Sequence, residues 1–235
     1  MFMKKEFFKI KNIPSILWGE KSDHVIIAVH GNFSNKADIP IQILSEIAIS
    51  KGYQVLGFDL PEHGDRKNDS TLCKVQECII DLNQIMTFAK NRWNKISIFG
   101  NSIGAYFSLM AFKDEAVEKA YFLSPVVNME QIIKNMMLSF QITEDLLQKE
   151  EIIQTPIGQI LYWDYYDYVK KHPVEQWNVP TYILYGDQDN LCSYDTLLDF
   201  QNKFPVYLKI LSNCEHFFHT SEQLNAFTLW LTDVL

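Results

Sequence analysis

One serine stands in a local sequence that would make its hydroxyl a nucleophile. Residues 100–104 read G-N-S-I-G, a G-x-S-x-G pentapeptide centred on Ser102. An apolar run of strand length, 96–99, comes before it, and a helical pattern over 103–112 follows. A tight strand-to-helix turn of this kind exposes the serine oxygen above a sheet. The pattern predicts a nucleophile elbow; the alternative is an ordinary strand–turn–helix corner with an incidental serine.

A serine hydroxyl is a weak nucleophile until a neighbouring base takes its proton. His216 follows the late apolar run 207–211, which places it where the carboxyl end of a strand meets a loop. We therefore predict that His216 is the base and later the general acid. His219 lies three residues further on and is the second candidate.

An acid that orients the imidazole is expected between the serine and the histidine in the chain, in the order Ser, Asp or Glu, His. Asp187 and Asp189 both follow the apolar run 182–185. Either carboxylate could orient the base, and either could instead form a turn. The residues alone leave this choice open.

The tetrahedral intermediate of acyl transfer needs two hydrogen-bond donors for its oxyanion. The backbone N–H of Ile103, directly after the nucleophile, is the first predicted donor. The second is expected in the loop after the strand 25–29, from the N–H of Asn32, with Phe33 as the near alternative. His30 in the same loop is expected to support it. The competing interpretation of this loop is an ordinary βα connection.

The elements that must position these residues alternate between strand and helix, which predicts an α/β protein with a mostly parallel central sheet and helices on both faces. Parallel strands are buried on both sides, so their apolar runs are continuous. Ligands of such sheets bind at the carboxyl ends of the strands. Expected strands are 7–10, 16–19 (a hairpin around Pro14), 25–29, 55–58, 96–99, 120–123, 182–185 and 207–211; expected helices are 39–51, 71–92, 103–112, 194–203 and 224–235.

Residues 126–177 break this alternation. They show helical patterns over 129–140, 144–153 and 160–170 and no convincing strand. We predict a helical cap inserted between two strands of a single domain that spans residues 1–235.

The cap has an aromatic composition, with W-D-Y-Y-D-Y over 163–168. Met136, Trp163 and Tyr166 are candidates for an apolar substrate-binding wall, together with Phe33 from the loop described above. Packing inside the cap is the competing explanation for each of them, since aromatic side chains are usually buried.

Composition narrows the function further. The net charge of −8, from 21 basic and 29 acidic residues, argues against nucleic acid as a partner. The four cysteines form no C-x-x-C pair, so neither a zinc site nor a dithiol redox motif is indicated. No metal and no cofactor are expected. The N-terminal segment 1–16 lacks the features of a signal peptide, and no apolar stretch has the length of a membrane span, so we expect no membrane association and a cytoplasmic location. A homodimer stays open.

Five segments resemble the α/β-hydrolase family, especially small capped esterases and lipases of the monoacylglycerol-lipase or feruloyl-esterase kind. They are V-H-G-N (29–32), F-D-L-P-E-H-G (58–64), G-N-S-I-G (100–104), 179–189, which ends in Y-G-D-Q-D, and E-H-F-F (215–218). The resemblance implies the α/β-hydrolase fold, a helical cap, Asp189 as the acid and the N–H of Asn32 in the oxyanion hole. Family members often carry Phe at position 32 and Gly at position 62; here Asn32 leaves a backbone donor, and Glu62 changes little.

Together these features predict an enzyme that hydrolyses a carboxylic ester of a small or medium apolar or aromatic acyl group through an acyl-enzyme, with a small-molecule ester as its partner. A thioesterase, a small peptidase or a cofactor-free haloperoxidase-type enzyme would use the same three side chains. A non-catalytic binding protein with this fold is the alternative from another class.

Overall fold

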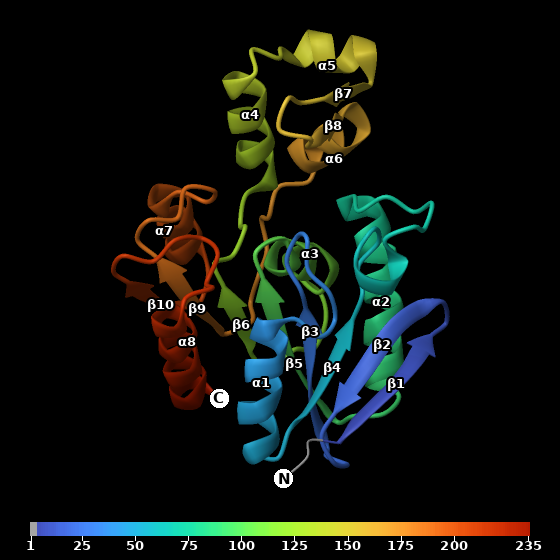
Figure 1. The fold of residues 1–235 in the computed structure, drawn as a ribbon, viewed down its shortest axis with the longest axis vertical. Coiled ribbons are helices and arrows are strands. Elements are labelled where there is room, and N and C mark those ends of the chain that lie inside the picture. Colours follow the sequence, from blue (N-terminus) through green and yellow to red (C-terminus); the bar gives the residue numbers. More distant parts are fainter. Residues whose placement is uncertain (1–3) are drawn as a thin grey trace.

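An eight-stranded sheet forms the centre of the computed structural model, which describes residues 4–235 (Figure 1). Residues 1–3, the start of the segment tested above for a signal peptide, lie outside the described residues. The spatial order is β1-β2-β4-β3-β5-β6-β9-β10; β2 is antiparallel to β1 and β4, and the other neighbours are parallel. The strands are β1 (Lys5–Ile10), β2 (Ile13–Trp18), β3 (His24–Val29), β4 (Gln54–Phe58), β5 (Lys95–Asn101), β6 (Ala120–Leu123), β9 (Thr181–Gly186) and β10 (Val206–Leu211).

Helices cover both faces of this sheet, as the continuous apolar strands predicted. Along β3, Val25 and Ile27 belong to one hydrophobic core, and Ile26 and Ala28 belong to the other. Helices α2 (Val75–Lys90), α3 (Ile103–Ala111) and α7 (Tyr194–Lys203) pack in the first core, and α1 (Ile39–Ser50) and α8 (Ser221–Val234) pack in the second. Among residues 4–235, no helix is both long enough and apolar enough to cross a bilayer.

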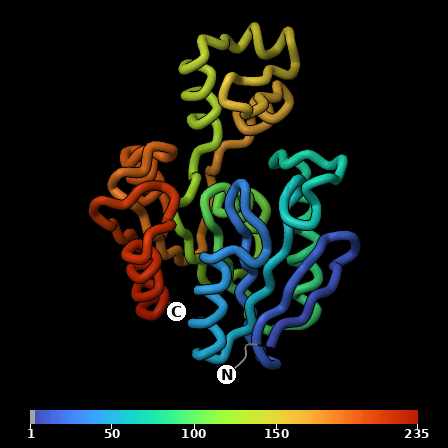
Figure 2. Tube along the Cα trace, viewed as in Figure 1, coloured from blue at the N-terminus to red at the C-terminus, as the bar shows by residue number. Residues whose placement is uncertain are grey.

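The segment between β6 and β9 leaves the sheet and returns to it, and Figure 2 shows this excursion above the strand ends. It contains α4 (Met129–Ser139), α5 (Glu144–Glu150), β7 (Ile152–Gln154), β8 (Ile160–Tyr162) and α6 (Trp163–Lys171). The expected helices over 144–153 and 160–170 are therefore wrong at 152–153 and 160–162, where a two-stranded antiparallel hairpin forms. The turn explains this: Thr155 N donates to the carbonyl of Gln159, and Gly158 has a positive φ of 84°.

The opening hairpin turns at Lys11, whose φ is 52°, and not around Pro14 as expected. Pro14 lies inside β2, opposite Lys9. Its carbonyl accepts the backbone N–H of Asp59, so this position contributes to the sheet without needing an N–H of its own.

Helix α2 begins at Val75, four residues later than its apolar spacing indicated. The residues before it are held by a distant contact, because Cys73 N donates to Glu62 Oε2 at 2.6 Å. Lys74 N in turn donates to the carbonyl of Leu72. These bonds keep 71–74 out of the helix.

Candidate active site

Ser102 occupies a strained turn between β5 and α3, as the pentapeptide predicted. Its φ of 53° and ψ of −117° are unusual for a residue with a side chain. Its N–H donates to the carbonyl of Leu123 at 3.0 Å, and its carbonyl accepts the N–H of Val126 at 3.1 Å. A Cβ on Gly100 would lie 2.6 Å from the backbone of α3, and one on Gly104 would overlap the backbone at the end of β3. The two glycines therefore permit the turn, and the bonds to the end of β6 hold it.

His216 and Asp189 reach this serine from the ends of β10 and β9. Ser102 Oγ lies 2.8 Å from His216 Nε2, and His216 Nδ1 lies 2.6 Å from Asp189 Oδ2. The Asp189 side chain is fully buried, and that of His216 is 18% exposed. The other carboxylate oxygen, Oδ1, accepts the N–H groups of Leu191 and Cys192 at 2.9 and 3.0 Å. Both oxygens of the carboxylate are therefore held in place, and Oδ2 is the one that contacts the imidazole.

Asp187 and His219, the alternative candidates for the acid and the base, make other contacts. The side chain of Asp187 is exposed, and its backbone N–H donates to the carbonyl of Leu211 at the end of β10. His219 is exposed and its Nδ1 lies 2.9 Å from the carbonyl of Phe217. Tertiary structure thus selects between aspartates that stand only two residues apart.

The loop after β3 approaches the elbow closely, since a Cβ on Gly31 would lie 3.4 Å from Ser102 Cβ. Ile103 is the first residue of α3, so its N–H has no acceptor within the helix. The N–H of Asn32 has no acceptor among residues 4–235, whereas Phe33 N donates to His63 Nε2 at 3.0 Å. Of the two candidate donors in this loop, Asn32 is the one that is free.

His63 supports this loop, a role that the sequence analysis did not assign. Its Nδ1 lies 2.7 Å from the Pro61 carbonyl, which can only accept, so Nδ1 carries the proton. Nε2 is then the acceptor for Phe33 N, and the side-chain oxygen Oδ1 of Asn32 lies 3.0 Å from the same nitrogen. The P-E-H-G part of the 58–64 segment was the available signal, but nothing local shows which loop the imidazole reaches.

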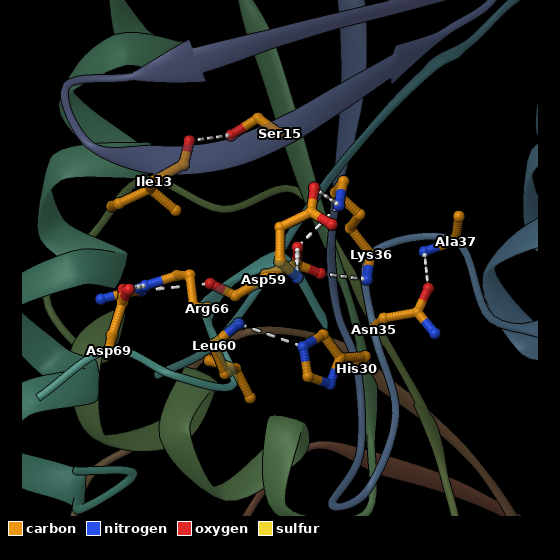
Figure 3. Close-up of polar contacts among 11 residues, drawn as sticks. Ile13, Ser15, His30, Asn35, Lys36, Ala37, Asp59, Leu60, Arg66 and Asp69 are labelled. Atoms are coloured by element: carbon orange, nitrogen blue, oxygen red, sulfur yellow. Dashed lines mark hydrogen bonds and ion pairs between the residues drawn. The ribbon is translucent and has the colours of Figure 1, made fainter. Parts of the chain in front are cut away.

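His30 fixes the other side of the same loop, as expected. The imidazole is completely buried, and this burial lowers the pKa of His30 to about 4, so the ring is neutral at pH 7. Nδ1 donates to the carbonyl of Gly31 at 2.7 Å. Nε2 accepts the N–H of Leu60 at 3.1 Å, a contact that Figure 3 shows.

A buried charge network extends this support away from the serine (Figure 3). Asp59 is fully buried and accepts both the N–H and the Nζ of Lys36, at 2.8 and 2.6 Å. Lys36 Nζ also pairs with Asp65 at 2.8 Å. Arg66 donates to the Asp59 carbonyl and pairs with Asp69. The aspartate of the 58–64 segment thus anchors the chain just beyond the loop that carries Asn32.

The predicted substrate-binding residues differ in their exposure. Phe33 is 91% exposed beside the elbow. Met136 and Trp163 are half-buried and pack against the first hydrophobic core. Tyr166 is fully buried, and its hydroxyl donates to Glu144 Oε1, so packing within the inserted segment accounts for this side chain.

A cavity of about 230 Å³ lies at the base of the cap, between α3, the start of α4 and α7. Tyr106, Val127 and Phe200 contribute to its wall. Ser102 and the four residues predicted to bind substrate are not among its lining residues, so it is separate from the serine.

The arrangement can activate a serine for attack on a carbonyl. A buried carboxylate orients an imidazole, the imidazole faces the hydroxyl, and free backbone N–H groups lie on the adjoining loop and helix. Among the residues from 4 onward, no three His, Cys, Asp or Glu side chains are placed to share a metal ion.

Comparison with known proteins agrees with this architecture. Residues 147–223 match the family model described as alpha/beta hydrolase fold. No curated protein sequence matches the chain.

Solved structures match along nearly the full length. Est1E from Butyrivibrio proteoclasticus with ferulic acid bound has a TM-score of 0.77 at 18% identity, over 97% of this chain and 96% of that chain. A putative hydrolase from Agrobacterium vitis S4 has a TM-score of 0.78 at 14% identity, over 97% of each chain. Alpha/beta hydrolase domain-containing protein 10 from mouse has a TM-score of 0.76 at 14% identity, over 98% of each chain.

The protein therefore has the α/β-hydrolase fold. The resemblance to the α/β-hydrolase family that the five segments indicated is confirmed.

Proposed function

We propose that the protein is a serine hydrolase that cleaves carboxylic esters. The observation that carries the proposal is the continuous chain of contacts from Ser102 Oγ through the His216 imidazole to the buried Asp189 carboxylate, at 2.8 and 2.6 Å. Three residues from three different strand ends meet in the geometry of an activated nucleophile.

The reaction follows from these contacts. Asp189 keeps the proton of His216 on Nδ1, which leaves the Nε2 lone pair facing the Ser102 hydroxyl. Nε2 takes the hydroxyl proton as Oγ attacks the ester carbonyl, and then gives it to the leaving alcohol. Water, deprotonated by the same nitrogen, attacks the acyl-enzyme and releases the acid while Ser102 regains its proton.

Negative charge develops on the carbonyl oxygen during both steps. The N–H groups of Ile103 and Asn32 are the proposed donors, because neither has an acceptor within its own element or loop. Two preorganised donors of this kind stabilise the tetrahedral intermediate more than the planar ester.

The substrate is proposed to carry a small or medium apolar or aromatic acyl group. Phe33 and Phe217 are 91% and 68% exposed, and each is the chain neighbour of a site residue, Asn32 and His216. The structurally similar Est1E binds ferulic acid, an aromatic acid. Exposed aromatic rings on residues next to the site residues in the chain suit an acyl group of this class. The four free thiols suit a reducing cytoplasm, which we propose as the location.

A fluorophosphonate probe tests the nucleophile directly, because it reacts with an activated serine without needing the right acyl group. Wild-type protein is expected to be labelled at Ser102, and Ser102→Ala is expected to lose the label. Ser212→Ala, which removes an exposed hydroxyl on the loop after β10, is the matched control and keeps it. An unlabelled wild-type protein of normal fold would reject the serine mechanism in favour of a binding protein.

Substrate class is tested separately with matched esters, thioesters and anilides of the same aromatic acid. The ester is expected to give the highest kcat/KM, with Ser102→Ala inactive on all three. A thioester or anilide turned over faster than the ester would move the assignment to a thioesterase or a peptidase.

A further inference from the structure

Two cysteine thiols lie side by side near His63, the residue that contacts the loop carrying Asn32. Cys73 Sγ is 3.8 Å from Cys78 Sγ, and both are free. Cys78 is fully buried in α2, whereas Cys73 is partly exposed on the segment before that helix. A small reagent can therefore reach one thiol, with the second directly behind it.

The surroundings of Cys73 favour its thiolate. The Cys78 thiol and the His63 imidazole together lower the pKa of Cys73 well below the usual range of a thiol. The Cys73 N–H donates to Glu62 Oε2 at 2.6 Å, which ties this segment to the residue before His63. Thiolates, not thiols, react with peroxides.

His63 links this cysteine pair to the proposed oxyanion donor. Its Nε2 accepts the Phe33 N–H and lies 3.0 Å from the Asn32 side chain. Burial acts to lower the pKa of His63, but Cys73 and the Pro61 carbonyl outweigh it and raise that pKa. The charge state of His63 thus depends on the state of Cys73.

We propose that Cys73 and Cys78 are a peroxide-oxidisable dithiol whose disulfide weakens the His63 support of the oxyanion loop. In the first step the Cys73 thiolate attacks one oxygen of hydrogen peroxide, the O–O bond breaks, and hydroxide leaves as Cys73 becomes a sulfenic acid. In the second step Cys78 sulfur attacks the Cys73 sulfur, the S–O bond breaks, and water leaves. Two thiols and one peroxide give one disulfide and two waters, so the two electrons lost by sulfur reduce the peroxide.

Formation of the disulfide requires movement at Cys73. A disulfide bond is about 2.05 Å long, so the two sulfur atoms must approach each other by almost half of their 3.8 Å separation. Cys78 is fixed inside α2, whereas Cys73 precedes the helix, so Cys73 moves away from its place beside Glu62 and His63. The effect on activity rests on the proposed ester hydrolysis; disulfide formation does not.

Peptide mapping after hydrogen peroxide treatment and alkylation tests the bond itself. Trypsin cuts after Lys74, between the two cysteines, so peptides 68–74 and 75–90 stay joined only through the disulfide. The joined pair is expected in oxidised wild type and in the matched control Cys214→Ser. It is expected to be absent in Cys73→Ser and after dithiothreitol. Oxidised wild type in which 68–74 and 75–90 remain separate overturns the proposal without any reference to hydrolysis.

The coupling to the site is tested by comparing each protein with itself before and after peroxide. Oxidised wild type is expected to lose at least about fivefold in kcat with KM changed by less than about twofold, because an oxyanion donor acts in the transition state. Dithiothreitol restores the rate, and Cys73→Ser shows no peroxide effect of this size. A disulfide that forms quantitatively with no change in kcat rejects the coupling. A protein that forms the disulfide but neither hydrolyses esters nor reacts with the fluorophosphonate rejects the proposed function instead.

Discussion

Replacing Asp189 with asparagine changes one atom in the buried contact that orients His216. Asp189 Oδ1 accepts two backbone N–H groups, from Leu191 and Cys192, and Oδ2 faces His216 Nδ1 at 2.6 Å. The amide oxygen of asparagine can replace only one of these two carboxylate oxygens. The amide NH₂ group must occupy the other position.

The two orientations of the amide differ in free energy. With the oxygen toward the two N–H donors, both of those hydrogen bonds are kept and the NH₂ group faces His216. With the amide reversed, two buried N–H groups face a donor, at a cost of about 1–3 kcal/mol for each unsatisfied group. The first orientation therefore prevails, because the side chain of Asp189 is fully buried and water cannot compensate.

An NH₂ group facing His216 Nδ1 forces that nitrogen to act as an acceptor. The proton of the neutral ring moves to Nε2, which lies 2.8 Å from Ser102 Oγ and can then no longer accept the serine proton. A wrong tautomer of this kind lowers kcat about 10⁴-fold. This factor corresponds to about 5.5 kcal/mol in activation free energy.

The assay is kcat and KM for an aryl ester, with the thermal unfolding temperature measured in parallel. Asp187→Asn is the matched control, because that exposed side chain stands two residues away in the same turn, and its kcat is expected to stay within about twofold of wild type. If Asp189→Asn keeps more than about a tenth of the wild-type kcat, or if Asp187→Asn loses as much, the assignment of the acid is refuted.

Two further predictions concern stability. Burial lowers the pKa of His30 from an ordinary value of 6.5 to about 4, so the unfolded chain takes up this proton at a higher pH than the folded protein does. The free energy of unfolding is therefore expected to fall by about 3 kcal/mol from pH 6.5 to pH 4. Urea titrations of His30→Gln should show a smaller fall of the free energy of unfolding over that pH interval. Lys36→Met leaves the fully buried Asp59 without its cation and is expected to lower the free energy of unfolding by about 3–5 kcal/mol. Lys4→Met, which breaks an exposed pair, should leave the free energy of unfolding nearly unchanged. Equal effects of the two lysine variants would show that burial of the pair does not matter.

The sequence predicted those structural features that depend on residues close together in the chain. The turn at Ser102 needs two small residues and a strand followed by a helix, and all of these lie within one short stretch of chain. The central strands were predictable because their runs of apolar residues are long enough to be buried on both faces. The strand 120–123 and the helix 194–203 were predicted at their observed bounds.

The sequence predictions failed where a structural feature depends on contacts that the sequence pattern does not reveal. Helix α2 begins at Val75 and not at residue 71 as predicted, because Cys73 N donates to the Glu62 carboxylate. The short strands β7 and β8 stabilise each other across a turn, which helical spacing in either one does not reveal. The Tyr166 hydroxyl donates to Glu144, a contact between two helices that the local sequence does not indicate.

The sequence by itself determined the elbow at Ser102, the alternating architecture, and the presence of an aspartate pair and a histidine in the right order along the chain. The residues alone left Asp187 and Asp189 open, and the family resemblance implied Asp189. The tertiary structure supplies the physical reason, because the backbone N–H groups of Leu191 and Cys192 fix the Asp189 carboxylate toward His216. Only the tertiary structure decided the contact of His63 with the loop that carries Asn32. Backbone preferences act over a few neighbouring residues, whereas the direction of a buried polar side chain depends on partners that the fold brings from elsewhere in the chain.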